Sequence, residues 1–369
     1  MARFSNPFFF ESPSDRWAFT DRDELGRTLV EYMRARGRRV LVHGRRRMGK
    51  TSLLLNAAKK AGTVFVHCDI SKGASLTEVA RRLLESAPAV EETLLKRVLR
   101  LAEKHFKSVT VTAHKVSLSG EFRADEGRQT LEGVLNYLNE QAGLMDRPWT
   151  VCLDEFQDLR KLMGERAAWQ MRGITQEHRH LNYLLSGSDH RLVKWMTSPD
   201  AGFFKQLSQV EVGPIEPGHL AAWIERRARV GGLTRFPHGP EIVATAGPCT
   251  GDIVRLAKVT FDLAAGGRTG GVVAAAFDAI ALGELNTEFN GQWRDLSLTQ
   301  RLVLRAIAAG RQPTAAATLR ELGIRTPSTA QTAIEALEDK QVLVRADGKL
   351  IFDHPFFRRW VDFNGRPHD

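Results

Sequence analysis

The chain of 369 residues is 43% hydrophobic and 26% charged, which is typical of a globular protein with enough chain for two or three domains. It has no apolar run of about 18 residues and no basic segment followed by an apolar core at its start, so neither a membrane-spanning helix nor a secretory signal is predicted. Its scattered cysteines, Cys68, Cys152 and Cys249, lack metal-ligand spacing and indicate a reducing compartment, so we expect a cytoplasmic protein.

The net charge of +10 is concentrated near the N-terminus. Residues 1–60 contain fourteen Lys and Arg against six Asp and Glu, residues 298–369 contain eleven against eight, and the rest is close to neutral. The excess surrounds one loop and comprises Arg34, Arg36, Arg38, Arg39, Arg45, Arg46 and Arg47. Such a cluster balances a polyphosphate ligand or faces another negative partner, such as DNA or an acidic protein surface.

The first predicted helix precedes this loop. Asp21 and Glu24 have the spacing of a capping box, which marks a helix start. Leu25, Leu29 and Met33 follow at helical spacing, so one face of this helix is predicted to be apolar.

Residues 44–51 read Gly-Arg-Arg-Arg-Met-Gly-Lys-Thr, a complete G-x-x-x-x-G-K-T phosphate loop. An apolar strand at 40–42 precedes the loop and an apolar helix start at 52–55 follows it, which is the context that the motif requires. The glycines allow backbone N–H groups to face the phosphates, Lys50 can reach the β and γ oxygens, and Thr51 can place its hydroxyl on Mg²⁺. We therefore expect the chain to bind a nucleoside triphosphate. The predicted nucleotide contacts are Gly44, Arg45, Arg46, Arg47, Met48, Gly49, Lys50, Thr51 and Ser52.

A second apolar strand, residues 149–153, ends in Asp154 and Glu155. Asp154 can hold Mg²⁺ through its water shell, and Glu155 can act as the general base that polarises the attacking water. A solvated turn would also carry two carboxylates, but two such motifs in this order, each at a strand end, favour a nucleotide site. The residues that follow, 156–159, are predicted to return to polar surface.

A third apolar strand, residues 181–185, runs into Ser186, Gly187 and Ser188. Ligands of open α/β sheets bind beyond the carboxyl ends of the strands. Ser186 or Ser188 is therefore expected beside the γ-phosphate as a polar sensor. A buried strand that ends in small turn residues is an equally weighted alternative.

The segments between and after these strands are less informative. Residues 71–146 form a long insert, predicted as helices plus a hairpin at 109–119. After a short strand at 210–212, residues 217–265 are predicted to form the helices of a small lid. This lid would either bring Arg255 toward the nucleotide or leave it on a solvated helix face.

The C-terminal part is predicted as a separate winged helix–turn–helix, with three helices followed by a hairpin that turns at Asp347 and Gly348. In DNA-binding domains of this kind the third helix reads the major groove. Here residues 326–340 hold three acidic residues against one lysine, which is a poor surface for phosphates. We therefore rank protein–protein or intramolecular docking ahead of DNA readout for this domain.

Taken together, these motifs resemble the archaeal-type ATPases of the STAND class, AAA+-related P-loop proteins that also occur in bacteria. The resemblance covers nearly the whole chain apart from residues 71–146. It rests on Asn6-Pro7-Phe8, Phe19-Thr20-Asp21-Arg22, Gly44 through Thr51, Leu153 through Gln157, Tyr183 through Ser188 and Asp353 through Trp360. It implies ATP binding and hydrolysis, a helical lid and a C-terminal winged helix.

The resemblance also implies roles for individual residues. It places Phe19 and Arg22 near the adenine, and it suggests Arg172 as an arginine finger. The chain departs from many relatives at residues 203–206, which read Phe-Phe-Lys-Gln where those relatives carry Tyr-Gly-Arg. A phosphate contact by that arginine is therefore not expected here.

The predicted fold class is α/β: a P-loop core with a parallel sheet at residues 1–215, a helical lid at 216–290 and a winged-helix domain at 291–369. We expect an ATPase that binds ATP and Mg²⁺. The protein would act as a nucleotide-driven conformational switch on an unidentified protein partner. The alternative is a DNA-binding ATPase resembling archaeal replication initiators. The basic N-terminal cluster favours the alternative, and the acidic third helix favours the switch. Self-association and non-specific DNA binding stay open, and no membrane partner is expected.

Overall fold

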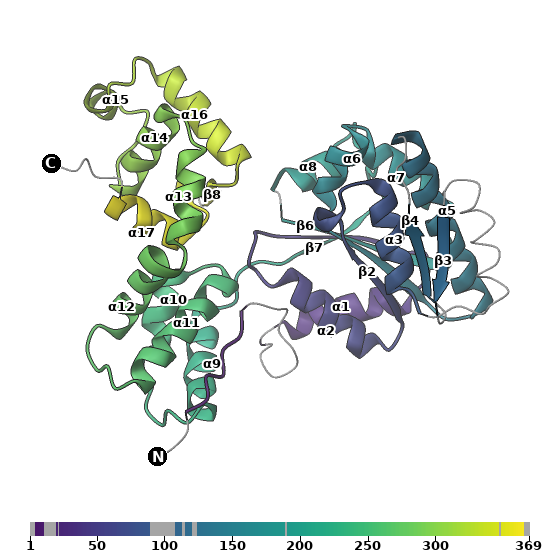
Figure 1. Cartoon of the computed structure of the whole chain (residues 1–369), viewed down its shortest axis with the longest axis horizontal. Helices are drawn as coiled ribbons and strands as arrows, with labels where there is room; N and C mark the ends of the chain where they lie inside the picture. Colours follow the sequence, from purple (N-terminus) through teal and green to yellow (C-terminus); the bar gives the residue numbers. More distant parts are fainter. Residues whose placement is uncertain are drawn as a thin grey trace. The chain divides into compact units, whose positions relative to one another are not determined.

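The computed structural model describes residues 4–10, 20, 22–88, 108–112, 115–119, 124–188, 190–346 and 348–364. They form two compact units (Figure 1). One spans Pro13–Gly213, and the other combines Pro214–Asp369 with the N-terminal segment Met1–Ser12. Within the described ranges, no helix is both long and apolar enough to cross a membrane.

The first unit is built on a five-stranded parallel sheet with the strand order β2-β5-β6-β1-β7. Its strands are β1 (Arg39–His43), β2 (Val64–Asp69), β5 (Trp149–Asp154), β6 (Leu181–Gly187) and β7 (Ser208–Glu211). The central strands β5 and β6 are buried along their whole length. Strands buried on both faces read as continuous apolar runs, which is why the sequence reveals them clearly. The predicted parallel α/β core is confirmed.

Helices cover both faces of this sheet. They are α1 (Asp23–Arg34), α2 (Lys50–Ala61), α3 (Leu76–Ser86), α5 (Ala124–Leu144), α6 (Leu159–Met163), α7 (Ala167–Thr175) and α8 (His190–Thr197). In Figure 1, α1 and α2 lie on one side of the sheet and the other five lie on the opposite side. The larger core is on that opposite side, where Leu135 and Met171 pack with Val66 and Leu153 of the sheet.

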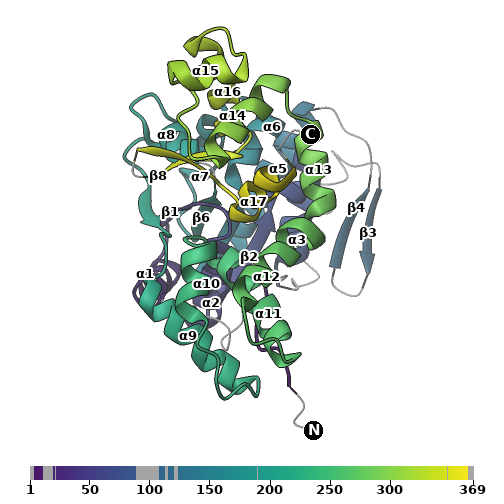
Figure 2. The same ribbon diagram turned by 90° about the vertical axis from the view of Figure 1, so that its left-hand side faces the viewer.

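The insert between β2 and β5 holds α3, α5 and an antiparallel pair, β3 (Ser108–Thr112) and β4 (Lys115–Ser119). Figure 2 shows this pair as a separate ribbon outside the five-stranded sheet. The expected helices and hairpin are therefore confirmed. The start of α1 differs from the prediction: the N-cap position is Arg22, with a non-helical φ of −139°. The predicted cap, Asp21, lies outside the described residues.

The second unit begins with the helices that were predicted as a lid. They are α9 (Pro217–Val230), α10 (Gly239–Ala246), α11 (Thr250–Ala265) and α12 (Val272–Asp278), followed by a π-helical turn at Ala279–Glu284. The N-terminal segment packs on them, because Phe8 meets the rings of Trp223 and Phe261 edge-on. Asn6 Nδ2 also donates to the Lys258 carbonyl at 2.9 Å.

The rest of the second unit forms the predicted winged helix. Its elements are α13 (Asn286–Arg294), α14 (Leu298–Ala308), α15 (Ala316–Leu322), α16 (Pro327–Asp339), β8 (Leu343–Ala346), β9 (Lys349–Phe352) and α17 (Pro355–Asn364). The strands pair from Leu343↔Phe352 to Ala346↔Lys349. Gly348 in the tight turn between them has a φ of 74°, as a left-handed turn residue should, while Asp347 lies outside the described residues.

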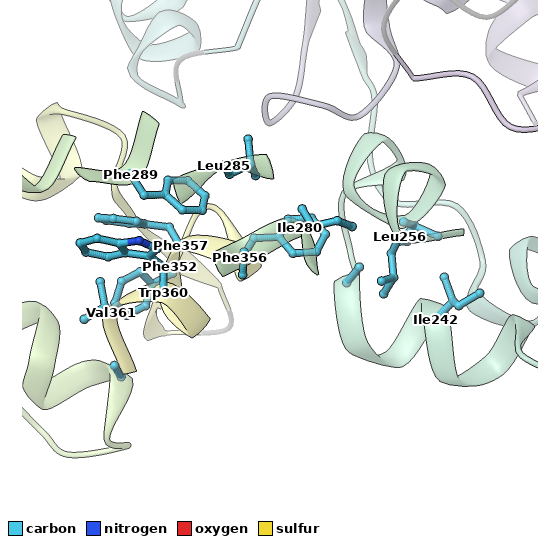
Figure 3. Close-up of a cluster of buried hydrophobic side chains, with 14 of the residues drawn as sticks. Ile242, Leu256, Ile280, Leu285, Phe289, Phe352, Phe356, Phe357, Trp360 and Val361 are labelled. Atoms are coloured by element: carbon cyan, nitrogen blue, oxygen red, sulfur yellow. The ribbon is translucent and has the colours of Figure 1, made fainter. Parts of the chain in front are cut away.

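One hydrophobic core runs through the lid helices and the winged helix (Figure 3). Phe356 of α17 reaches toward Ile280, whereas Phe357 and Trp360 of the same helix pack around Phe289. Arg359 of α17 adds a 2.7 Å ion pair with Asp278 of α12. The boundary predicted between residues 290 and 291 falls inside α13, so a division into two domains there stays a prediction.

Candidate nucleotide site

The carboxyl ends of β1, β5 and β6 meet at one edge of the sheet. His43, the last residue of β1, lies beside Gly187, the last residue of β6. The loop at 44–49 follows β1, Asp154 is the last residue of β5, and Ser188 follows β6. The sheet therefore gathers the three motifs at the edge where open parallel sheets bind ligands.

The phosphate loop contains three residues with positive φ: Gly44 at 152°, Arg47 at 61° and Gly49 at 85°. Gly44 has a second requirement, because a Cβ there would lie 2.4 Å from the carbonyl oxygen of Val212. Left-handed residues among right-handed ones turn successive N–H groups toward one side and create an anion-binding concavity. This concavity lies at the N-terminus of α2, where the helix dipole also favours an anion.

Lys50 is the first residue of α2 and is only 6% exposed. Its Nζ donates to the carbonyls of Gly44 and Arg45 at 2.8 and 2.9 Å, so the ammonium is held across the loop. Thr51 and Ser52 follow it in the first turn of the helix. The structure describes every residue of this turn, and none of them is acidic. No acidic residue of the helix's own first turn therefore offsets the positive potential at this end.

Arg22 stabilises the phosphate loop through hydrogen bonds to backbone carbonyls. The residue is 8% exposed, and its Nη2 donates to the carbonyl of Met48 at 3.2 Å and to that of Gly213 at 2.7 Å. Arg22 thus links the phosphate loop to the last residue of the first unit. Its expected position near the adenine stays a prediction, and Phe19 lies outside the described residues.

Thr51 and Asp154 form the metal end of the site. The Thr51 hydroxyl donates to Oδ2 of Asp154 at 2.8 Å, and Asp154 is 4% exposed. Burial alone would raise the pKa of Asp154, but the neighbouring His67, Thr51 and Ser186 side chains outweigh it and lower the pKa to about 2. The carboxylate is therefore ionised at neutral pH. An ionised carboxylate beside a hydroxyl suits Mg²⁺, which prefers hard oxygen ligands.

Two further polar side chains lie beside Asp154 at the metal end of the site. The buried Nε2 of His67 and Oγ of Ser186 have no hydrogen-bond partner within the described part of the chain. Both side chains adjoin Asp154, and His67 Nε2 is 3.6 Å from its Oδ2. Buried polar atoms without partners are rare in folded proteins and indicate missing water or ligand. The residues present therefore fit Mg²⁺ at Thr51 and Asp154.

Glu155 is positioned by its backbone and by two hydrogen bonds. Its φ of 51° is unusual for a residue other than glycine. Its Oε2 accepts from Ser188 Oγ at 3.0 Å and from Nε2 of Gln157. Ser188 accepts in turn from Arg46 Nε at 3.4 Å. The expected base, the expected sensor and a loop arginine thus form one hydrogen-bonded chain.

Gln157 and His67 were not foreseen. The prediction of polar surface at 156–159 is wrong, because Phe156 and Leu159 are buried and Gln157 is half-buried. Gly187 makes room for the glutamine, since a Cβ at Gly187 would lie 2.4 Å from Gln157 Oε1. His67 could have been noticed only as a polar residue near the end of an apolar strand, β2. No sequence motif links it to Asp154.

Arg172 of α7 contacts its own unit. Its Nη1 donates to the Gly202 carbonyl at 3.1 Å, and its guanidinium lies 5.3 Å from the ring centre of Trp169. Trp169 is 48% exposed, so this arginine–tryptophan pair is at the surface. A role as an arginine finger stays a prediction.

Arg255 belongs to α11 of the second unit. Its Nη2 pairs with Glu284 at 3.1 Å, and its guanidinium lies 4.8 Å from the ring centre of Phe10. These contacts hold the arginine against the N-terminal segment. A contact between Arg255 and nucleotide stays a prediction.

Comparisons with known proteins address the fold. Residues 287–362 match a family described as a probable winged helix domain. No curated protein matches the chain in sequence. Among solved structures, the chain is similar to a Walker-type ATPase of Pyrococcus abyssi, with a TM-score of 0.69 and 20% identity over 96% of this chain and 99% of that one.

Two further structures extend the similarity. The ORC2 protein of Aeropyrum pernix gives a TM-score of 0.59 at 15% identity, covering 98% of this chain and 97% of that one. The ORC1 protein of Aeropyrum pernix, solved in complex with DNA, gives 0.51 at 15% identity, covering 94% and 93%. The chain therefore has the fold of archaeal Walker-type ATPases with a C-terminal winged helix, as the resemblance in sequence implied.

Proposed function

We propose that the protein binds ATP with Mg²⁺, hydrolyses it, and uses the bound nucleotide to switch its conformation on a macromolecular partner. The observation that carries the proposal is the joint placement of the Lys50 loop, the Thr51–Asp154 pair and Glu155 at one sheet edge. The fold shared with Walker-type ATPases supports it. In this proposal the protein acts in the cytoplasm.

The chain's own groups account for binding. Backbone N–H groups of the loop and the N-terminus of α2 would hold the phosphates, and Lys50 would move its contacts from the Gly44 and Arg45 carbonyls to the β and γ oxygens. Thr51 and Asp154 would hold Mg²⁺, which neutralises charge on those oxygens when it is bound. Because Asp154 is already ionised, no proton must be lost for it to do so.

Glu155 accounts for hydrolysis. A carboxylate within hydrogen-bond reach of water can take its proton as the water attacks the γ-phosphorus. Ser188 and Gln157 both donate to the same oxygen, Oε2, and so leave Oε1 for the water. Phosphoryl transfer depends mainly on positioning and electrostatic stabilisation, which this network supplies.

Two variants of the purified protein test the proposal. Lys50→Ala should abolish ATP binding measured by calorimetry, because it removes the cation held across the loop. Glu155→Gln should retain binding but lose phosphate release by about 10²- to 10⁴-fold, the usual contribution of a general base. Wild-type protein that binds no ATP, or Glu155→Gln protein with the wild-type rate, would disprove the assignment.

A DNA-binding ATPase is the second candidate, supported by the winged helix and by the likeness in fold to ORC1, which was solved with DNA. Two features weigh against it. Arg34 donates to the carbonyls of Ala61 and Lys60, and Arg39 to that of Thr175, so part of the basic N-terminal cluster is engaged within the unit. On α16 the amide of Gln331 donates to Glu335 at 3.0 Å. A protein partner is therefore preferred.

A further inference from the structure

His67 lies on the strand next to Asp154 and on the same face of the sheet. In the parallel register of β2 and β5, His67 pairs with Cys152 and Asp69 with Asp154. Because side chains two residues apart point to the same face, Cys152 and Asp154 share the face that His67 occupies. This placement brings the imidazole near Asp154 although 87 residues separate the two in sequence.

The ring of His67 is fixed and its Nε2 is aimed at the carboxylate. The imidazole stacks on Phe65, with ring centres 6.1 Å apart and an interplanar angle of 11°. Its Nε2 is 3.6 Å from Asp154 Oδ2, beyond ordinary hydrogen-bond length. The same Oδ2 accepts the 2.8 Å hydrogen bond from Thr51. The nitrogen therefore approaches the metal end of the site without bonding to it directly.

A second buried polar atom approaches from the opposite strand. Ser186 is on β6, which pairs with the other side of β5, and it is completely buried. Its Oγ, like His67 Nε2, has no hydrogen-bond partner within the described ranges. Asp154 is thus flanked on both neighbouring strands by polar groups that are buried and unsatisfied.

We propose that His67 and Ser186 hold the water shell of Mg²⁺ at Thr51 and Asp154, with His67 acting as a positioning residue rather than a metal ligand. This inference rests on the proposed function. Mg²⁺ gives up its waters reluctantly and is usually bound through only one or two carboxylates, so most of its contacts with a protein are made through water. With its hydrogen on Nε2, His67 would donate to a water that bridges it to Asp154, because 3.6 Å is too long for a direct hydrogen bond between the two side chains.

The experiment compares nucleotide affinity with and without metal. Fluorescent ADP is titrated into the full-length protein in a Mg²⁺ series and in EDTA. His67→Phe keeps a ring on Phe65 but removes Nε2, whereas His67→Gln keeps an N–H donor of similar reach. His180→Gln, which replaces a histidine just before β6, is the matched control. Thermal unfolding shows whether each variant is folded.

His67→Phe should raise the half-saturating Mg²⁺ concentration about 10-fold, within the 10- to 100-fold range typical of groups that support a metal site. It should leave the ADP affinity in EDTA unchanged. Ser186→Ala should act in the same direction, and His67→Gln should restore much of the loss. This pattern would support the proposal.

Three results would overturn it. The first is an unchanged Mg²⁺ dependence of ADP binding in both His67→Phe and Ser186→Ala. The second is an equal loss of ADP affinity with and without Mg²⁺. Either result would mean that these residues contribute only to packing. A loss of Mg²⁺ dependence as complete as in Asp154→Ala would instead make His67 a direct ligand. Wild-type protein that binds no ADP under either condition would refute the proposed function itself. The three results above are distinct from that outcome, because in each of them the wild type still binds ADP.

Discussion

The hydroxyl of Ser188 donates a 3.0 Å hydrogen bond to Oε2 of Glu155. The two residues come from neighbouring strands, because Ser188 follows β6 and Glu155 follows β5. Arg46 of the phosphate loop reaches the same serine at 3.4 Å. A movement of Arg46 on nucleotide binding would therefore be transmitted to Glu155, the proposed base, through Ser188. These two hydrogen bonds connect the phosphate loop to the proposed base in the proposed switch.

Ser188→Ala should lower the rate of ATP hydrolysis without weakening ATP binding. A hydrogen bond to a charged group is worth about 1.5 to 3 kcal/mol, and each 1.4 kcal/mol is about tenfold in rate, so we expect a loss of 10- to 100-fold. Single-turnover phosphate release and calorimetric ATP affinity separate the two effects. Ser188→Thr keeps the hydroxyl and is the control, and equal losses in both variants would indicate crowding rather than a lost hydrogen bond.

Arg172→Ala should remove the dependence of ATP turnover on protein concentration. AAA+-type cores often complete their site with an arginine from a neighbouring copy, and such a finger contributes about 10³-fold or more. Arg172 is half-buried next to the exposed Trp169, where a second copy could meet it. We expect slow turnover in dilute protein that rises with concentration in the wild type but not in Arg172→Ala.

The control for this experiment is Arg166→Ala, an exposed arginine at the start of the same helix. It should behave like the wild type. Turnover per molecule that stays constant from dilute to concentrated wild-type protein, with monomers in light scattering, would contradict the finger.

His178 should make the first unit less stable in mild acid. Its Nε2 is 2.7 Å from Asn136 Oδ1 and its Nδ1 is 2.5 Å from the Tyr183 hydroxyl, an arrangement that suits the neutral ring. Burial, together with the charge of Arg39, lowers the pKa of His178 to about 4. The unfolded chain, with a pKa of about 6.5, takes up the proton first. Stability is therefore complete above about pH 6.5 and falls as the pH drops toward 4.

The measurement is urea unfolding of wild type and His178→Gln between pH 4.5 and 7. Glutamine can accept from Tyr183 and donate to Asn136 but does not titrate. Each pH unit of separation is worth about 1.4 kcal/mol, so the advantage of the wild type over the variant should shrink by roughly 2 to 3 kcal/mol toward pH 4.5. Parallel pH curves for the two proteins would contradict the assignment.

The sequence predicts those parts of the site in which chemistry and local structure coincide. Asp154 stands out because a fully buried strand ends there, and Lys50 because its motif joins a strand to a helix. His67 and Gln157 could not be predicted, since their roles depend on side chains that only the sheet brings together. The finger role of Arg172 is suggested by the family resemblance, and the structure of one chain does not test it, because the group that a finger serves belongs to another copy.

The capping of α14 is a different case. Ser297 and Gln300 form a complete capping box, which fixes the start of this helix at Leu298. The spacing of the apolar residues does not mark that start, because Leu298 is exposed and lies outside the buried face of the helix.

Duplex DNA should bind weakly and without sequence preference. Apart from Pro327, the exposed residues along α16 are hydroxyl-bearing or acidic: Ser328, Thr329, Thr332, Glu335 and Asp339. Glu338 pairs with Arg345 of β8 at 2.9 Å, so this basic residue of the hairpin is engaged with an acidic residue of α16. Groove readers use Arg, Asn or Gln toward base edges. Gln331 is the one such residue on this helix, and its amide is already bonded to Glu335.

The test is fluorescence anisotropy with random and genomic duplexes over a salt series, with and without ATP. We expect dissociation constants no tighter than the 10⁻⁴ to 10⁻⁶ M of non-specific binding at physiological salt. Gln331→Ala should leave them unchanged, because it removes a side chain that contacts its own helix. Arg38→Ala, which removes an exposed arginine of the N-terminal cluster, should reduce the slope of log affinity against log salt by about 0.9 if that arginine meets a phosphate. Tight binding to one sequence that is lost in Gln331→Ala would favour the initiator-like ATPase over the switch on a protein partner. Gln331 would then have to break its hydrogen bond to Glu335 and read a base instead.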